Sequence, residues 1–348
     1  MLSGLRGLMA SRTLPAASRA GTASACLELV RAGQLGSDND RLFERKADVG
    51  AMEAAVEACG ARFLTWDDAE YPSQLRTIHD PPFALFIRGR ELPAADSAVA
   101  IVGARRCSSL GREIAHDIGH GLATAGVSVV SGAAHGIDSA SHQGALDAGG
   151  HTVAVLGCGI DVAYPARSRA LIRDIAERGT LLSEYPPGVP PDPFRFPARN
   201  RIVAGLCSAT VVVEGAEGSG SNITGEHALE FGRDVFAVPG SVNNALSHVP
   251  LALIRDGATM IRGVRDLLAD LQLDQVAALP PPDLTLAERA ALDALVGLTL
   301  PERVARELDL GLADVVPLLM GLEIRGLVRS VGGRYEATLA AGRGRSAG

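Results

Sequence analysis

The sequence predicts an α/β fold: a Rossmann-like parallel sheet with helices on both faces, preceded by a small helical N-terminal region and followed by a small winged-helix domain. Two observations support this prediction. Between residues 99 and 238, short runs rich in Val, Ile, Leu and Ala alternate with stretches of helical composition, which is the pattern of βαβ units. After a Pro-rich segment near residue 280, three short amphipathic stretches precede two β-prone runs separated by Gly332-Gly333.

Each predicted strand of the central sheet is a short, continuous apolar run, as expected for parallel strands that are buried on both faces. The strands are predicted at residues 99–102, 127–130, 152–156, 180–182, 210–213 and 235–238. The helices between them are predicted at 111–125, 137–148, 167–177, 199–206 and 222–231. An earlier apolar run, 83–87, ends at a turn at Gly89.

The flanking segments differ in composition from this core. Residues 1–22 contain arginines but no acidic side chain, and we expect them to be disordered or to follow a misassigned start codon. Residues 23–64 are interpreted as a small helical region of the SAM or HhH-like type, with helices at 25–32 and 51–59. The Rossmann-like domain is assigned to 65–275, a Pro-rich linker to 276–284, the winged-helix domain to 285–340 and a disordered tail to 341–348.

The bulk composition excludes several classes of protein. No apolar run reaches the ~18 residues of a membrane span, and five separated cysteines without a secretory signal indicate a reducing, cytoplasmic location. The formal net charge of −7 argues against binding polyanions through bulk positive charge, so any nucleic-acid site must be local. Lys46, the one lysine, follows no glycine-rich loop, which excludes a P-loop ATPase. His116 and His120 have no evident third ligand, so no metal site is predicted.

Small residues follow strand after strand at the predicted carboxyl edge of the sheet. Ligands of open α/β sheets bind outside this edge, where glycine permits close backbone approach and helix N-termini present unsatisfied amides. Several such loops together make a surface that can hold several phosphates. The candidates are Gly103, Ser131, Gly132, Gly157, Gly159, Ser219, Gly220 and Ser221.

Cationic and polar side chains surround the same edge. Arg105, Arg106 and Ser108 follow the first predicted strand of the parallel sheet, and Arg199-Asn200-Arg201 opens a helix after a Pro-rich crossing. Positions two apart on a helix point in different directions. We therefore expect one of Arg199 and Arg201 to contact a ligand and the other to be structural, and the sequence leaves open which.

Carboxylates and aromatic rings at this edge each have two interpretations. Glu184 and Glu214 could be catalytic, but capping a helix N-terminus or holding an arginine is the favoured role. Phe194 and Phe196 could stack on bases, but burial under the Pro-rich loop is favoured. The segment at Gly157 lacks the third glycine of a dinucleotide fingerprint, so NAD binding is not expected and no cofactor is predicted.

Several motifs occur in a specific order between residues 66 and 261. They include Val99-Ala100-Ile101-Val102-Gly103-Ala104-Arg105, Val130-Ser131-Gly132-Ala133-Ala134-His135-Gly136-Ile137-Asp138, Phe196-Pro197-Ala198-Arg199-Asn200-Arg201 and Ser219-Gly220-Ser221-Asn222-Ile223-Thr224. In this order they resemble the bacterial DNA-processing protein A family (DprA, also called Smf).

The resemblance implies a non-enzymatic recombination mediator. Such a protein binds and protects incoming single-stranded DNA and loads the RecA recombinase onto it during natural transformation, and it forms a homodimer through the Rossmann-like domain. The resemblance places the DNA contacts at the strand ends described above and adds Gly136 and Thr224 from the same motifs. Phosphate binding through amides and a few arginines agrees with the acidic charge of the chain.

Two other functions stay open on the sequence. A related Rossmann-like enzyme would cleave the N-glycosidic bond of a nucleoside monophosphate, with Glu214 or Glu226 as the carboxylate. A scaffold would contact RecA and hardly bind DNA. In the C-terminal domain, the helix predicted at 312–325 carries Asp314 and Glu323 against Arg325 alone, whereas a major-groove helix needs more donors. We interpret this domain as a protein-contact module.

Overall fold

The computed structural model describes residues 23–273, 284–325 and 327–337. The chain divides into two compact units, Met1–Leu273 and Asp274–Gly348, and each is described by itself. The predicted N-terminus 1–22, the tail 341–348 and all of the linker 276–284 except Leu284 lie outside the described residues. Among the helices of the described part, none has the length and apolar character needed to span a bilayer.

The larger unit is built on one sheet, which holds nine strands in the described residues. β2 runs antiparallel to both of its neighbours, β1 and β6. All neighbours from β6 to β9 pair in parallel. The strands, in order across the sheet, are β1 (Ala61–Thr65), β2 (Ala84–Gly89), β6 (Thr180–Ser183), β5 (Thr152–Leu156), β4 (Ser128–Ser131), β3 (Ala98–Val102), β7 (Ala209–Val212), β8 (Asp234–Ala237) and β9 (Thr259–Met260).

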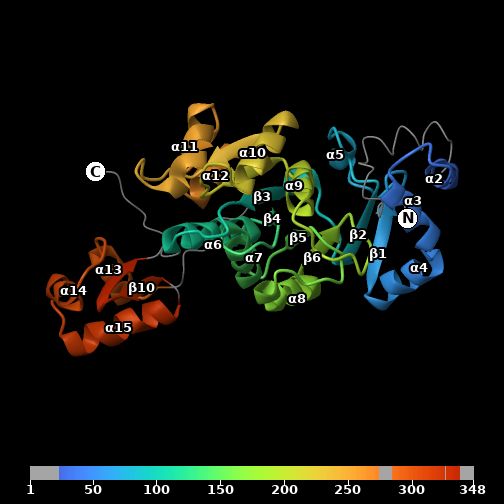
Figure 1. Cartoon of the computed structure of the whole chain (residues 1–348). Coiled ribbons are helices and arrows are strands. Elements are labelled where there is room, and N and C mark those ends of the chain that lie inside the picture. Colours follow the sequence, from blue (N-terminus) through green and yellow to red (C-terminus); the bar gives the residue numbers. More distant parts are fainter. Residues whose placement is uncertain (1–22, 274–283, 326, 338–348) are drawn as a thin grey trace. The chain divides into compact units, whose positions relative to one another are not determined.

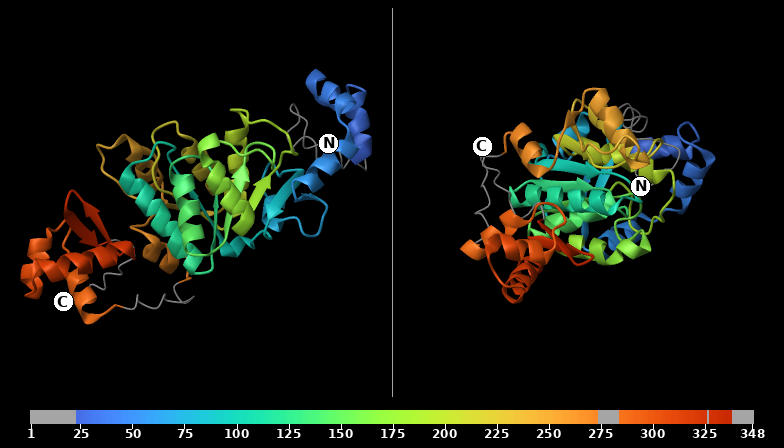
Figure 2. Two further views of the ribbon diagram at one scale, coloured as in Figure 1. Left: turned by 90° about the horizontal axis from the view of Figure 1, so that it is seen from below. Right: turned by 90° about the vertical axis from the view of Figure 1, so that its left-hand side faces the viewer.

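Helices cover both faces of this sheet, which confirms the predicted fold class (Figures 1 and 2). One face packs against α6 (Ser109–Thr124), α7 (Ile137–Asp147) and α8 (Arg169–Arg178). The opposite face packs against α9 (Arg195–Gly205), α10 (Gly220–Glu230) and α11 (His248–Arg255). Two shorter helices support these layers: α5 (Ser73–Arg76) contacts α9, and α12 (Val264–Asp270) contacts α6.

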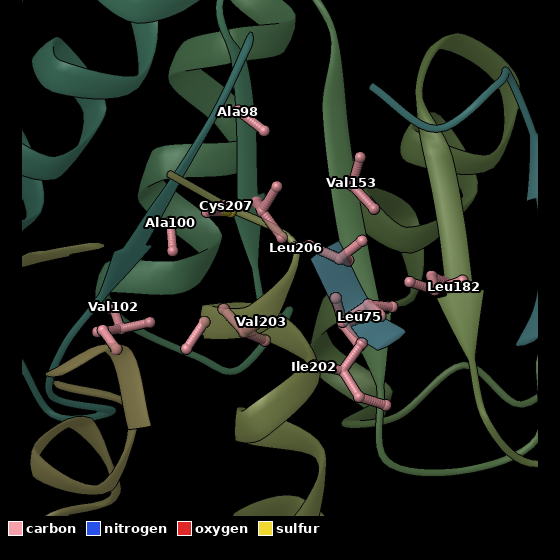
Figure 3. Packing of buried hydrophobic residues seen from close by; sticks show 14 of the residues in the cluster. Leu75, Ala98, Ala100, Val102, Val153, Leu182, Ile202, Val203, Leu206 and Cys207 are labelled. Atoms are coloured by element: carbon pink, nitrogen blue, oxygen red, sulfur yellow. The ribbon is translucent and has the colours of Figure 1, made fainter. Parts of the chain in front are cut away.

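The central strand β3 shows why its sequence is a continuous apolar run. Val99 and Ile101 face the core formed with α6 and α7. Ala98, Ala100 and Val102 face the opposite core, beside buried residues of α9 (Figure 3). All five side chains are buried, so the strand is covered on both faces as the pattern predicts.

The N-terminal region is helical but departs from the prediction in two places. It contains α2 (Ala23–Arg31), α3 (Asp38–Lys46) and α4 (Val49–Ala58), and α3 is not among the predicted helices. The signal for α3 is a capping box, in which Ser37 and Asp40 each accept a hydrogen bond from the backbone N–H of the other. Residues 61–64, expected in the helical region, instead belong to β1, which pairs along its whole length with β2.

The C-terminal unit has the predicted succession of three helices and a hairpin. The helices are α13 (Leu286–Ala294), α14 (Pro301–Leu308) and α15 (Leu312–Ile324). The antiparallel pair β10 (Val328–Val331) and β11 (Arg334–Ala337) follows, and a bridge from Thr299 to Tyr335 extends it. These elements enclose an apolar core of their own.

His116 links α6 to α7 and gives the fold a dependence on pH. Its Nδ1 lies 3.5 Å from Asp117 Oδ1 and its Nε2 2.9 Å from Asp147 Oδ2. Hydrogen bonding to Asp117, together with the contact to Asp147, raises the pKa of His116 above its ordinary value. A raised folded-state pKa stabilises the protein below the unfolded-state pKa of about 6.5, and the effect is lost as pH rises through the folded-state value.

We therefore expect the wild-type protein to lose more stability than His116→Gln when pH rises from about 6 to about 9. Urea denaturation midpoints at the two pH values measure the difference. His120→Gln is the control, because His120 lies beside His116 on the same helix but forms no ion pair with a carboxylate of residues 23–273. Equal losses in wild type and His116→Gln would contradict the proposed link.

Candidate nucleic-acid interface

The strand order reverses beside β3. From β3 the chain proceeds to β4, β5 and β6 on one side and then crosses to β7, β8 and β9 on the other. Open α/β sheets bind ligands in the crevice outside the carboxyl ends of the strands at such a switch point. Here those ends are the loop after β3, residues 103–108, and the loop after β7, residues 213–219.

The N-terminus of α6, which follows the loop after β3, is capped by a carboxylate of the same chain. Glu214, from the loop after β7, accepts the Ser108 N–H at 2.8 Å and the Ser108 hydroxyl at 2.6 Å. Ser108 is the N-cap of α6 and accepts in turn from the Gly111 N–H. Glu214 thus has the predicted capping role. Ser108, a candidate DNA contact, has both of its donors engaged within the protein.

The N-terminus of α10 is different, because its N-cap residue, Ser219, makes no side-chain capping hydrogen bond. The hydroxyl of its N-cap, Ser219, lies 2.8 Å from that of Ser221. Asn200 reaches across from α9 and donates from Nδ2 to the Gly220 carbonyl at 3.1 Å. Gly220 is exposed, so this helix end presents partly positive backbone amides to an anion.

Arg105 and Arg106 supply exposed positive charge at the switch point. Both follow β3 and are exposed, and within residues 23–273 neither forms an ion pair with a carboxylate. The Arg105 guanidinium lies 5.5 Å from the centroid of the Phe196 ring. That ring stacks on Tyr164 with the two centroids 5.4 Å apart. A free guanidinium beside stacked aromatic rings suits a nucleotide chain, because it can take a phosphate while the rings take a base.

The predicted burial of the two phenylalanines is wrong for Phe194, which is 52% exposed. Phe196 is half-buried, and its ring covers Gly157 on one side. Tyr164, which is 43% exposed, is missing from the sequence-derived candidates. The signal that could have found it is its position in the loop that follows β5, within reach of the Pro-rich crossing.

Arg199 is buried at the strand ends, with only 3% of its surface exposed. Its Nη1 donates to the carbonyl of Gly132 at 2.8 Å and to that of Val155. Burial lowers the pKa of Arg199 to about 10, against the opposing effect of Asp138. A Cβ on Gly132 would overlap the guanidinium, so a glycine is needed at this position. Arg199 therefore joins α9 to the ends of β4 and β5.

Arg201 is buried as well, so both arginines have structural contacts, and the expectation that one of the two contacts a ligand is not met by the structure. Its Nη1 and Nη2 donate to the Glu184 carboxylate at 2.6 and 2.8 Å. Its Nε lies 3.1 Å from Asp80 Oδ2 and donates to the Asp80 carbonyl at 2.7 Å. Glu184 thus holds an arginine, as predicted. The buried Arg201 has its donors engaged within the protein and is withdrawn from the DNA contacts.

Two hydroxyl candidates also have internal partners. Ser131 is fully buried and donates to the Ile101 carbonyl at 2.6 Å. Thr224 is 2% exposed and donates to the Gly220 carbonyl at 3.4 Å. Ser131 thus joins β4 to β3, whereas the Thr224 hydroxyl bonds within α10.

Three glycine candidates are buried, and each lies directly against a neighbouring segment. Gly136 has a φ of 91°, and a Cβ there would overlap the Ala104 carbonyl oxygen. Gly157 lies under the Phe196 ring, and Gly159 donates its N–H to the Val189 carbonyl of the Pro-rich crossing at 2.8 Å. The exposed or half-buried candidates other than Ser108, together with Tyr164 and Phe196, are called here the strand-end surface: Gly103, Arg105, Arg106, Gly132, Tyr164, Phe196, Asn200, Ser219 and Gly220.

A comparison with known families assigns this chain to one of them. Residues 62–272 match the family model of DNA recombination-mediator protein A, which is more than half of the chain. This chain belongs to the DNA recombination-mediator protein A family. The matched region runs from β1 to beyond α12, so it contains every residue of the strand-end surface of this family member.

Relatives in the DNA recombination-mediator protein A family support the assignment. DNA processing protein DprA of Streptococcus pneumoniae is 45% identical over 210 residues, covering 60% of this chain and 74% of the relative. A putative DNA processing protein DprA of Mycobacterium tuberculosis is 36% identical over 347 residues, covering 91% of this chain and 88% of the relative. The second match is long enough to extend into the C-terminal unit.

Solved structures of DNA recombination-mediator proteins share the fold. The X-ray structure of the S. pneumoniae protein has a TM-score of 0.65 at 35% identity, covering 77% of this chain and 94% of that one. A structure of DNA processing protein A from Helicobacter pylori, which describes single-stranded DNA binding by that protein, has a TM-score of 0.56 at 27% identity. It covers 61% of this chain and 97% of that one.

Removal of one carboxylate tests the anchoring of α9. We expect Glu184→Ala to destabilise the protein by about 3–5 kcal/mol, because it leaves the buried Arg201 with Asp80 as its one remaining carboxylate. Glu91→Ala is the matched control, since Glu91 pairs with Arg62 at the surface and is 85% exposed there. The control should cost less than about 1 kcal/mol. Urea denaturation measures the free energy of unfolding of both variants, and similar losses of stability in the two would rule out the anchoring role.

Proposed function

We propose that this chain is a single-stranded DNA-binding recombination mediator that protects incoming DNA and loads RecA onto it during natural transformation. The observation that carries the proposal is Arg105, exposed and unpaired with any described carboxylate, beside the Phe196–Tyr164 stack at the switch point. Membership of the DNA recombination-mediator protein A family supports it. The proposal includes a homodimer formed through the Rossmann-like domain.

The strand-end surface can hold a nucleotide chain by two kinds of contact. The open N-terminus of α10 and the guanidinium of Arg105 take successive phosphates. The exposed ring of Tyr164, which stacks on Phe196, takes a base by stacking, which every base can provide. None of these contacts reads a base edge, so we expect binding with little sequence preference.

The nucleotide-hydrolysing alternative has less support. The Glu214 carboxylate is engaged by both donors of Ser108. Glu226 is exposed and accepts from Asn222 Nδ2 at 2.7 Å, one turn further along α10. Neither carboxylate stands free above the strand ends, so we propose no catalytic residue.

A salt titration of binding to fluorescent oligo-dT tests the DNA contact. Each phosphate that the protein neutralises releases condensed counterions and adds about 0.7 to the magnitude of the slope of log affinity against log salt for a single strand. We expect Arg105→Ala to weaken binding and to make this slope shallower by about 0.7. Arg173→Ala, which removes an exposed arginine on α8, should keep the wild-type slope. An absence of binding by wild type at low salt would end the DNA proposal.

The aromatic stack has a separate test. We expect Phe196→Leu to weaken binding to oligo-dT by about 1–3 kcal/mol while hardly changing binding to an abasic strand of equal length, since the abasic strand has no base to stack. Phe63→Leu is the control, because Phe63 is a 49% exposed aromatic residue on the edge strand β1. Equal weakening on both strands would show that Phe196 acts on the fold and not on bases.

RecA loading is tested apart from DNA binding. We expect wild type to speed RecA filament formation on single-stranded DNA coated with a single-strand-binding protein, and Arg105→Ala to lose this effect as its DNA binding falls. Fluorescence of labelled RecA follows the filament. If wild type binds DNA but does not speed filament formation, the protein binds single-stranded DNA and the loading role is contradicted.

A further inference from the structure

The loop after β4, residues 132–136, contains a residue in an unfavourable backbone conformation. Ala133 has a φ of 53°, in the left-handed region that residues other than glycine rarely adopt. Its side chain is fully buried. Such a conformation persists only where the surrounding structure determines it, and it is found most often at functional sites. Contacts on both sides of Ala133 must therefore hold this backbone in place.

Asp138, in the first turn of α7, supplies these contacts. Its carboxylate accepts hydrogen bonds from the backbone N–H groups of Gly132 and Ala134, the second of them to Oδ2 at 3.3 Å. Asp138 is buried. The next residue, Ser139, donates from Oγ to the Ala134 carbonyl at 2.6 Å. Backbone N–H groups that converge in this way form an anion-binding nest, and here the bound anion belongs to the protein itself.

Arg199 contacts the same loop from the side of α9. Its Nη1 donates to the Gly132 carbonyl at 2.8 Å, so both polar groups of the Gly132 backbone are engaged by buried charged side chains. A Cβ on Gly132 would overlap Arg199 and Asp138 alike. Burial raises the pKa of Asp138, and the Arg199 guanidinium and the two N–H groups oppose this effect. The two charges thus compensate each other beside one glycine.

The loop after β4 in turn contacts the backbone that carries Arg105. The Ile137 N–H donates to the Ala104 carbonyl at 3.3 Å. A Cβ on Gly136 would overlap the carbonyl oxygens of Ala104 and Arg105. A Cβ on Gly103 would overlap the Ile137 side chain. Because the two loops are in such close contact, a displacement of the loop after β4 would also move the start of the loop after β3 and the exposed Arg105.

We propose that Asp138 is a positioning residue for the DNA contact of Arg105. Its carboxylate fixes the loop after β4, and this loop fixes the backbone from which Arg105 extends. The inference rests on the proposed function, because it concerns affinity for single-stranded DNA. A carboxylate close to a phosphate site ordinarily weakens DNA binding through its charge. Asp138 instead strengthens binding, because it holds the backbone that presents the guanidinium.

Removal of the carboxylate charge separates these two effects. If Asp138 acted only through its charge, Asp138→Asn would bind fluorescent oligo-dT more tightly than wild type. We expect it instead to bind about tenfold more weakly, because the loop after β4 is released. Glu217→Gln is the matched control, since Glu217 is 87% exposed in the loop after β7, and it should bind at least as tightly as wild type. Binding by Asp138→Asn as tight as wild type or tighter would overturn the proposal.

A double-mutant cycle shows whether Asp138 acts through Arg105. The titrations are made at low salt, where weakened variants still bind. We expect Asp138→Asn to weaken binding about tenfold in the wild-type background and less than about twofold in the Arg105→Ala background. An equal loss in both backgrounds would show that Asp138 acts elsewhere, and the proposal would be wrong. An absence of binding by wild type would instead contradict the proposed function itself.

Hydrogen exchange in the full chain supplies a measurement that needs no DNA. We expect Asp138→Asn to exchange faster than wild type in residues 103–108 and 132–138 and at the wild-type rate in α8. Unchanged exchange in both loops would overturn the proposal even if DNA binding fell.

Ser139→Ala serves if Asp138→Asn does not fold, because it removes a single hydrogen bond to the same loop. We expect a smaller loss of affinity for oligo-dT, which again disappears in the Arg105→Ala background. A loss of equal size in both backgrounds would contradict the proposal.

Discussion

The strand-end surface depends on two buried arginines that hold α9 across the carboxyl edge of the sheet. Arg201 joins α9 to Glu184 and Asp80, and Arg199 joins it to the carbonyls of Gly132 and Val155. A buried guanidinium without partners costs several kcal/mol, so these contacts are satisfied together or the helix is displaced. Asn200 lies between the two arginines, and its side chain is therefore aimed at α10. Phe196 lies one turn earlier, next to Arg105.

Two helix N-termini meet this edge, and the protein treats them differently. At α6 the chain supplies its own anion, because Glu214 accepts from the N-cap Ser108. That carboxylate repels a phosphate from the end of α6. At α10 the N-cap residue, Ser219, makes no side-chain capping hydrogen bond. Under the proposed function, this contrast favours a nucleotide strand that runs from Arg105 toward the N-terminus of α10 over one that runs along the whole edge.

The sequence predicts the framework better than the contacts. Continuous apolar runs located every strand from β3 to β8, because a parallel strand buried on both faces cannot alternate polar with apolar residues. The roles of Gly157, Gly159 and Ser131 depend on what packs over them from distant segments, which spacing along the chain does not reveal. The same holds for Arg199 and Arg201: their sequence positions show that they point differently, but only the locations of their partners show that both are structural. β1 was missed because its pairing partner, β2, lies beyond the intervening segment 66–83.

An acidic chain can still hold a polyanion when its few free cations are of the right kind. All but one of the basic residues are arginines. A guanidinium is planar and weakly hydrated, so it can lie near an aromatic ring and keep its N–H edge available for a phosphate. Arg105 is placed in this way beside Phe196. Because the ring already limits the conformations of the free side chain, less conformational entropy is lost on binding. The remaining attraction comes from backbone amides, which add no net charge. Binding at this edge is therefore compatible with a net charge of −7, because it rests on local dipoles and one preorganised guanidinium and not on the overall field of the protein.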